Sequence, residues 1–339
     1  MEPEPGDWLA VREYLRRNRH ELTARAARLY PADAAVAGTP LLSAPGWLLD
    51  APLPVRDITI EFRPDAAPAP ELGPPVSYAE TMLALAPPAV FENRPTYRLL
   101  DADLPRLVFG PGCYFDGIDT GEAVAHEYAA GGARLRDAIG NPLDLTRRPA
   151  NLAISTLTVR RDRAGRARFL LHWRDPAKVA HAGGMYQVVP VGMFQPPGSG
   201  DADPRGADHP HPPDELWRSM VREFAEELAG QPEGADIEPF VRRMTDALND
   251  GRIGAWCVGL GVDPLSFATD LLTVLVIDED LFGELCRDAG RLNAEGRVLT
   301  ARTFDASTVT RTVQDEPLQA AGAAVLRLAW THRAAFGLG

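Results

Sequence analysis

Three glutamates in the second half of the chain have a spacing that could support metal chemistry. Glu223, Glu226 and Glu227 lie at positions i, i+3 and i+4, so in a helix their carboxylates leave the same side within one turn. Like charges placed in this way repel, and Arg222 balances only part of them. Hard divalent cations take clustered carboxylate oxygens together with substrate phosphates, and they activate water. The triplet therefore predicts phosphoanhydride hydrolysis, or else an exposed helix face rich in a good helix former.

The residues around the triplet predict the helix that carries it. It begins near Asp214, whose side chain can cap the first turn, and it ends before Gly230. Apolar residues recur every four positions along it, at Leu216, Met220, Phe224 and Leu228. We expect this apolar face to pack on the core and to fix the direction of the carboxylates.

Three β-rich runs precede the helix. Residues 152–160 and 166–173 flank a polar connection that contains Gly165, which predicts a hairpin. A third run, 186–194, contains Pro190 and Gly192, which confine it to a strand end, an edge or a bulge. Residues 196–213 are rich in Pro, Gly and Asp and predict a surface loop. Further on we expect strands over 255–261 and 270–277, and helices over 237–249, 280–288 and 318–335.

The run 222–228, Arg-Glu-Phe-Ala-Glu-Glu-Leu, resembles the R-E-apolar-x-E-E core of the Nudix box. That box is the signature of hydrolases that cleave a nucleoside diphosphate linked to another group. The resemblance covers about 151–339, and the approach through Pro190 and Gly192 is similar to the family's Leu-Pro-Gly-Gly. It implies a mixed sheet sandwiched between helices, with Glu223, Glu226 and Glu227 as ligands of Mg²⁺ or Mn²⁺.

The same resemblance implies two supporting roles and shows two departures. Arg222 would orient a box carboxylate by a salt bridge, and Gly192 would open the box loop at the substrate. The usual box has a Glu between its glycine and its arginine. Counted forward from Gly192, this position is Gly198, and counted back from Arg222 it is Asp214. Asp214 or its neighbour Glu215 could replace the missing Glu. Residues 193–213 also read as an insertion. The interrupted box therefore leaves open a domain that binds a nucleotide without cleaving it.

Other candidate residues lie outside the box. Glu295 is the expected general base, with Asp263 and Asp270 as rivals. Phe194 could stack on a nucleobase, as could Tyr186 or Trp256, although aromatic residues beside strands usually belong to the core. Arg174 and Lys178 could meet phosphate or be surface cations. In the inserted loop, His209 and His211 could supply a ligand or a proton, although histidines in such loops are usually exposed.

Residues 1–150 are predicted to form an α+β accessory or cap domain, and residues 151–339 the Nudix-like domain. The first part has an amphipathic pattern over 7–30, a strand pattern over 55–62, and a Gly-Pro-Gly at 110–112 that predicts a turn. We also expect a helix over 78–85, a strand over 106–109 and a helix over 120–130. His126-Glu127 lacks the second histidine of a zinc motif. This part of the chain therefore offers little chemistry of its own.

Composition limits the classes of function. The chain has 339 residues, 47 acidic against 35 basic residues and a net charge of -12, which is the wrong sign for bulk binding to nucleic acid. The sequence has no apolar run long enough for a membrane span and no secretory signal, so we expect a cytoplasmic protein. Its three cysteines, at 113, 257 and 286, have no CxxC spacing and are expected to be buried thiols.

The sequence as a whole predicts an α/β protein that hydrolyses a phosphoanhydride in a small nucleotide-type substrate. The rival class is a nucleotide-sensing or partner-binding module, because the second half is similar to Nudix-like modules of actinobacterial regulators, which carry a helix-turn-helix in front. The resemblance also implies a bacterial origin and a homodimer. A purely structural interaction protein, which would bind neither metal nor nucleotide, is the third class.

Overall fold

The computed structural model describes residues 7–68, 70, 77–88, 91–174, 184–196, 214–286, 296–298 and 301–339. Helices and mixed sheets alternate through it, which confirms the predicted α/β class. No helix in these ranges combines the length and the apolar character needed to span a bilayer. Cys113, Cys257 and Cys286 are buried free thiols, as expected.

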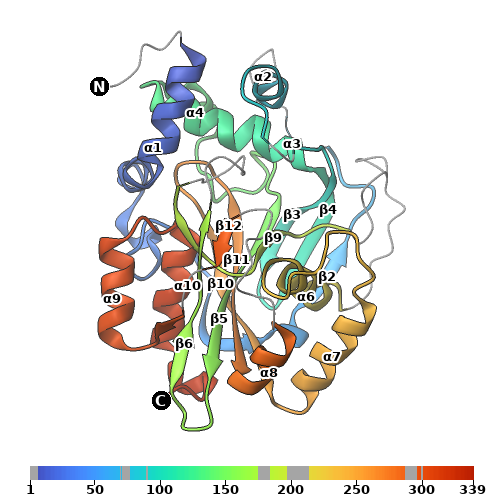
Figure 1. Cartoon of the computed structure of the whole chain (residues 1–339). Coiled ribbons are helices and arrows are strands. Elements are labelled where there is room, and N and C mark those ends of the chain that lie inside the picture. Colours follow the sequence, from blue (N-terminus) through green and yellow to red (C-terminus); the bar gives the residue numbers. More distant parts are fainter. Residues whose placement is uncertain are drawn as a thin grey trace.

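A mixed sheet of seven described strands forms the centre of the molecule (Figure 1). β5 and β11 run parallel, with Leu152 opposite Thr269, and most residues of both strands are buried. β9 pairs antiparallel with the first half of β5, and β6 with its second half. The strands are β1 (Leu48–Pro54), β10 (Ile253–Val262), β11 (Thr269–Asp278), β5 (Leu152–Arg161), β6 (Ala167–Phe169), β13 (Arg302–Thr303) and β9 (Val191–Met193).

Helices cover both faces of this sheet. One core cluster joins the sheet to α6 (Glu215–Glu227), α7 (Glu238–Asn249) and α8 (Glu279–Leu285). A second cluster joins the opposite face to α9 (Ala306–Asp315) and α10 (Ala320–Thr331), followed by η5 (Arg333–Phe336). The result is the expected sheet sandwiched between helices, and α6 is held in it by its buried apolar side.

Two smaller sheets adjoin the main one. One contains β12 (Gly296–Val298), β7 (Leu171–Arg174) and β8 (Tyr186–Val188), and the other β2 (Thr59–Phe62), β4 (Arg106–Cys113) and β3 (Pro95–Asp103). The second of these joins the main sheet where Leu99 donates its backbone N–H to Ala150 and Tyr97 donates to Phe194. The small N-terminal sheet is therefore bonded to the start of β5 and the end of β9.

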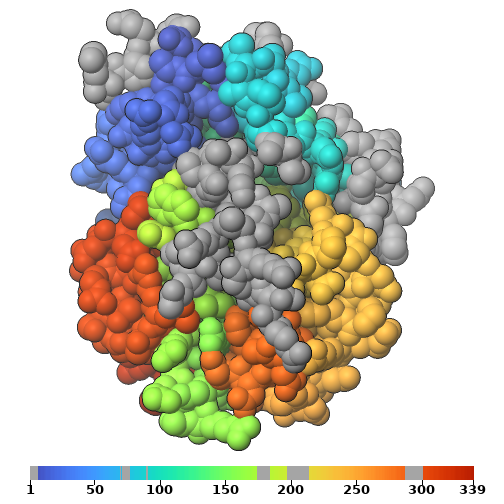
Figure 2. Space-filling view, viewed as in Figure 1, coloured from blue at the N-terminus to red at the C-terminus, as the bar shows by residue number. Residues whose placement is uncertain are grey.

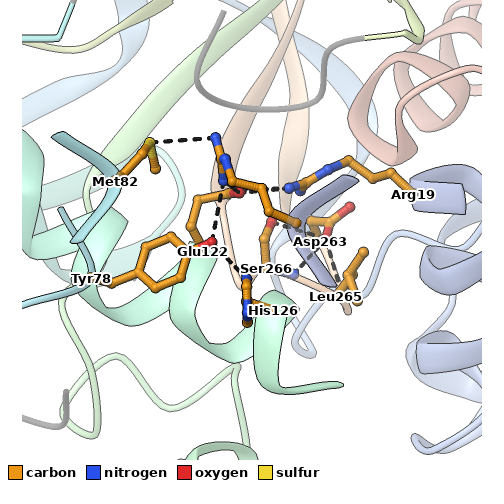
Figure 3. Close-up of polar contacts among 9 residues, drawn as sticks. Arg19, Tyr78, Met82, Glu122, His126, Asp263, Leu265 and Ser266 are labelled. Atoms are coloured by element: carbon orange, nitrogen blue, oxygen red, sulfur yellow. Dashed lines mark hydrogen bonds and ion pairs between the residues drawn. The ribbon is translucent and has the colours of Figure 1, made fainter. Parts of the chain in front are cut away.

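Helices of the first part of the chain form one end of the molecule (Figure 2). They are α1 (Trp8–Ala27), α2 (Tyr78–Leu85), α3 (Tyr114–Gly117), the π-helix η4 (Ile118–Glu122), α4 (Ala123–Ala129) and α5 (Arg134–Ile139). The first part of the chain also has the single turns η1 (Ala32–Ala34), η2 (Val36–Gly38) and η3 (Val55–Asp57). Figure 3 shows the polar network that joins α1, α2 and α4. Both Glu122 oxygens accept hydrogen bonds from Arg19, at 2.7 and 2.8 Å, and Tyr78 Oη lies 3.0 Å from His126 Nδ1.

Two local predictions for the first part of the chain are wrong. The strand expected over 55–62 is interrupted, because Val55–Asp57 forms a turn and β2 begins at Thr59. The expected turn at Gly110–Gly112 lies inside β4, where the absence of side chains lets Ala66 and Arg98 approach the strand. β1 pairs with β10 of the main sheet. The division of the chain at residue 150 stays a prediction.

Candidate functional site

The three predicted glutamates lie on α6, which packs against β9 and the core. Leu216, Met220 and Phe224 are almost completely buried on one side of this helix. The helix begins directly after Asp214, as expected, although the Asp214 side chain makes no capping hydrogen bond. Because the apolar side is fixed in the core, the rotation of α6 is fixed as well, and two of its carboxylates are directed at β9.

Glu223 lies directly on the backbone of Gly192. A β-carbon at position 192 would be 1.9 Å from Glu223 Cδ and 2.3 Å from each of its carboxylate oxygens. Any other residue at this position would therefore displace the carboxylate. The Glu223 side chain is 14% exposed, and Arg222 Nη2 lies 3.4 Å from its Oε1. The structure thus brings together the glycine, the arginine and the first glutamate of the predicted site.

Glu227 lies one turn further along, against the neighbouring residue of β9. The backbone N–H of Val191 donates a long hydrogen bond, 3.5 Å, to Glu227 Oε1. On the other side, Glu227 Oε2 is 3.8 Å from Nδ1 of His172, which is 1% exposed. Glu227 itself is only 8% exposed. Its carboxylate is therefore held in the interior between a backbone amide and an imidazole.

His172 is a residue of the site that the sequence did not reveal. It lies on β7 and reaches Glu227 across 55 positions of sequence, a pairing that depends on how two sheets meet. Its only local signal is that it is a polar residue inside a run that is otherwise apolar or aromatic, Leu171-His172-Trp173. A polar residue in such a run predicts a buried partner but does not identify it.

Arg222 is half-buried and braces the site locally. Its Nη2 donates to Ser219 Oγ at 3.1 Å and to Glu223 Oε1 at 3.4 Å. Glu226 is half-buried on the same helix. Within the described ranges, no three His, Cys, Asp or Glu side chains converge on a point where they would complete a metal site. The helix therefore supplies carboxylates of the right chemistry but not a closed set of ligands.

Glu215, in the first turn of α6, is a buried acid. It is 2% exposed, and its Oε2 makes no hydrogen bond to any described residue. Burial raises its pKa from the ordinary 4.5 to about 7, against the attraction of Arg222 and Arg218. Burial also raises the pKa of the Tyr97 hydroxyl group, and the nearby Glu215 carboxylate raises it further. This part of the helix is a poorly solvated environment in which a carboxylic acid is stable in its neutral form.

The remaining candidates take other positions. Phe194 is 1% exposed, and its ring packs between Tyr97 at 4.6 Å and Phe109 at 5.1 Å, so its faces belong to the core. Asp263 accepts backbone N–H groups of Leu265 and Ser266, and Asp270 accepts from Ser155 Oγ at 2.7 Å. Both rival bases therefore make structural hydrogen bonds.

Several predicted residues are not placed by the structure. The Arg174 backbone pairs with Gly296 at the end of β7, but its side chain lies outside the description. Glu295, Lys178, His209 and His211 lie outside the described residues altogether. Their roles in phosphate binding, proton transfer or metal binding stay predictions. Of the alternative aromatic residues, Tyr186 packs on Trp173 and Trp256 packs on Phe336.

Solved structures similar to this chain include two Nudix hydrolases. The first is a Nudix hydrolase from M. smegmatis, RenU, at 16% identity and a TM-score of 0.27, with 55% of this chain and 87% of that chain covered. The second is a Nudix hydrolase from Alicyclobacillus acidocaldarius, at 14% identity and a TM-score of 0.29, with 52% and 90% covered. No protein-family model and no curated protein matches the chain. At these TM-scores neither structure transfers a residue role to this chain.

Glu215 makes the stability of the protein depend on pH. Its pKa is higher in the folded protein than in the unfolded chain, so the folded state binds the proton more tightly and stability is lost as pH rises from 4.5 through about 7. Glu215→Gln is neutral at every pH. We expect its melting temperature to exceed that of the wild type at pH 8, with the difference shrinking towards pH 5.

Thermal melting at both pH values measures this effect. Glu284→Gln, at a surface glutamate paired with Arg243, is the control and is expected to show no such advantage. A constant difference between Glu215→Gln and the wild type across this range would mean that Glu215 is ionised in the folded protein.

Proposed function

We propose that the protein hydrolyses a phosphoanhydride bond in a small, nucleoside diphosphate-linked substrate with the help of a divalent cation. The observation that carries this proposal is that Glu223 and Glu227 lie against adjacent residues of β9, Gly192 and Val191. Gly192 allows Glu223 to approach β9, and the packing of the core fixes α6, the helix that carries both carboxylates. The resemblance of residues 222–228 to the Nudix box supports the same function.

Electrostatics favours a cation at this position. Two carboxylates one turn apart repel each other, and the repulsion is stronger because their side chains are only 14% and 7% exposed. Arg222 lies beside Glu223 and His172 beside Glu227, each at more than 3 Å. A divalent cation near the carboxylates would offset the repulsion more fully, since it carries twice the charge of Arg222, and His172 is charged only when it is protonated.

The donor set suits Mg²⁺ or Mn²⁺ shared with a substrate. Mg²⁺ usually takes one or two protein carboxylates and completes its shell with waters and substrate phosphates. That habit agrees with carboxylates that form no closed ligand set among the described residues. Glu223 and Glu227, with Glu226 on the same turn, would hold the cation. When bound, it would neutralise phosphate charge and activate a water molecule.

The residues around the carboxylates have positioning roles in this proposal. Arg222 orients Glu223 from its own helix, and His172 limits the rotation of the Glu227 carboxylate from β7. Gly192 admits Glu223 to the backbone of β9. Glu295 as the general base and Arg174 as a phosphate ligand are also part of the proposal and rest on sequence position alone.

A nucleotide-sensing module is the second candidate function. The departures of this chain from the usual Nudix box, with Gly198 or Asp214 where the box has a Glu, favour it. Such a module would bind a nucleotide diphosphate without releasing product. Substitutions of the glutamates would then change ligand affinity little, which separates this function from hydrolysis.

Turnover assays test the proposal directly. We expect release of phosphate or nucleoside monophosphate from at least one of ADP-ribose, NAD, nucleotide sugars and nucleoside triphosphates, with Mg²⁺ or Mn²⁺ and not with EDTA. Glu226→Gln and Glu227→Gln should abolish turnover and leave folding almost intact, because they remove only a charge. Glu284→Gln on α8 should keep full activity. Ligand-induced thermal stabilisation without any product would instead establish the sensing module.

Gly192→Ala should separate activity from stability. The new methyl group must displace the Glu223 carboxylate, which is the end of a flexible side chain and can move. We therefore expect little change in melting temperature but a loss of about 100-fold in kcat/KM, as for a misplaced catalytic group. Gly283→Ala on α8, where a β-carbon meets no atom within 4 Å, is the matched control. Full activity in Gly192→Ala would exclude Glu223 from the site.

Metal binding should depend on nucleotide. Because the described residues form no closed ligand set, we expect Mn²⁺, measured by electron paramagnetic resonance, to bind at least about tenfold more tightly when a non-hydrolysable ADP analogue is present. Glu227→Gln should remove this gain. Equal Mn²⁺ affinity with and without the nucleotide would show that the protein supplies the complete ligand set, which contradicts the shared site.

A further inference from the structure

Three buried hydroxyl groups lie close together on β5, and their partners differ. Ser155, Thr156 and Thr158 are all 1% exposed or less. The Ser155 hydroxyl group donates to Asp270 and that of Thr156 pairs with Thr273, so both bond to the neighbouring strand β11. The Thr158 hydroxyl group instead donates to a backbone carbonyl outside β5 and β11, at 2.8 Å. Thr158 therefore joins β5 to a different part of the chain.

The acceptor is the carbonyl of Val189, which lies between β8 and β9. The backbone of Thr158 holds a second segment, because its carbonyl accepts the N–H of Leu170, between β6 and β7, at 3.1 Å. In the antiparallel pairing of β7 with β8, Leu171 is opposite Val188. Leu170 and Val189 are therefore the next pair across the end of that ladder. Thr158 thus bonds to both chains where the ladder ends.

The two segments lead to the two sides of the Glu227 carboxylate. His172 follows Leu170 by two residues, and its Nδ1 lies 3.8 Å from Glu227 Oε2. Val191 follows Val189 by two residues, and its N–H donates to Glu227 Oε1 at 3.5 Å. A shift of either segment would therefore change one of these two distances directly.

We propose that Thr158 is a positioning residue, which sets the separation of Val191 and His172 and so fixes the Glu227 carboxylate between them. This inference rests on the proposed function, in which Glu227 helps to hold the cation. Without the hydroxyl group, the buried carbonyl of Val189 would lose this donor, and its segment would move to recover a partner. Thr158 acts on the reaction through Glu227.

Thr158→Val removes the hydroxyl group and keeps the shape of the side chain. Because a displaced metal ligand weakens catalysis more than substrate binding, we expect kcat to fall by at least about tenfold with KM almost unchanged. Thr158→Ser keeps the hydroxyl donor, and we expect it to recover most of the lost kcat. The assay uses the substrate and the divalent cation with which the wild type shows turnover.

Thr156→Val is the matched control, because it also removes a buried hydrogen bond from β5 but no side-chain bond to the segment before β9. We expect both valine variants to lower the melting temperature by about 2 °C. Only Thr158→Val should lose kcat. Similar kcat values in the two valine variants would overturn the proposal, because the Thr158 hydroxyl group would then contribute to stability alone.

Nitrogen-15 NMR of the His172 imidazole, at one fixed pH, tests the same inference without turnover. His172→Gln identifies its signals among those of the seven histidines. We expect the Nδ1 signal of His172 to shift in Thr158→Val and to keep its position in Thr158→Ser and Thr156→Val. An unchanged signal in Thr158→Val would overturn the proposal even if the wild type is active.

The two measurements also separate this inference from the proposed function. If the wild type hydrolyses none of the substrates tested, the proposed function fails. A shift of the His172 signal in Thr158→Val alone would then still support Thr158 as the residue that positions Glu227.

Discussion

The contact of the Glu223 carboxylate with the backbone of Gly192 is the constraint on which the candidate site depends. It requires a position without a side chain on β9, and it requires α6 to present its polar side to that strand. The packing of the core meets the second requirement, because Leu216, Met220 and Phe224 fix the rotation of the helix. A core that packs tightly allows little adjustment of such a helix. The direction of the carboxylates is therefore a consequence of apolar packing.

The sequence predicted the parts of the site that lie close together along the chain. The spacing of Glu223 and Glu227 and the apolar side of α6 are local patterns, and the structure places them on one helix as expected. The role of these glutamates in binding metal stays a prediction. His172 and the burial of Glu215 could not be predicted, because both depend on which segments meet in space. Gly110–Gly112 was misread for a similar reason. Glycines predict turns from local propensity, whereas here they make room for neighbouring side chains inside a strand.

Two parts of the molecule hold buried charge in different ways. At the N-terminal end, Glu122 accepts two short hydrogen bonds from Arg19, so the charges are matched and the helices α1 and η4 are joined (Figure 3). At α6, Glu223 lies 3.4 Å from Arg222 and Glu227 lies 3.8 Å from His172. The close contact of Arg19 with Glu122 is the geometry that a buried structural salt bridge needs. In the function proposed above, the carboxylates of α6 would instead share a cation with the substrate.

The way the first 150 residues are attached bears on how such a site stays ordered. β9 is a strand of three residues whose ladder partners come from β5, so it has few hydrogen bonds of its own. Phe194 directly follows β9. Its backbone N–H donates to the carbonyl of Leu152, and its carbonyl accepts from the N–H of Tyr97. The Phe194 ring packs between the rings of Tyr97 and Phe109. Residues of the N-terminal sheet thus fix the end of β9. Since Gly192 lies two residues earlier, this anchoring also limits the movement of the backbone on which Glu223 rests.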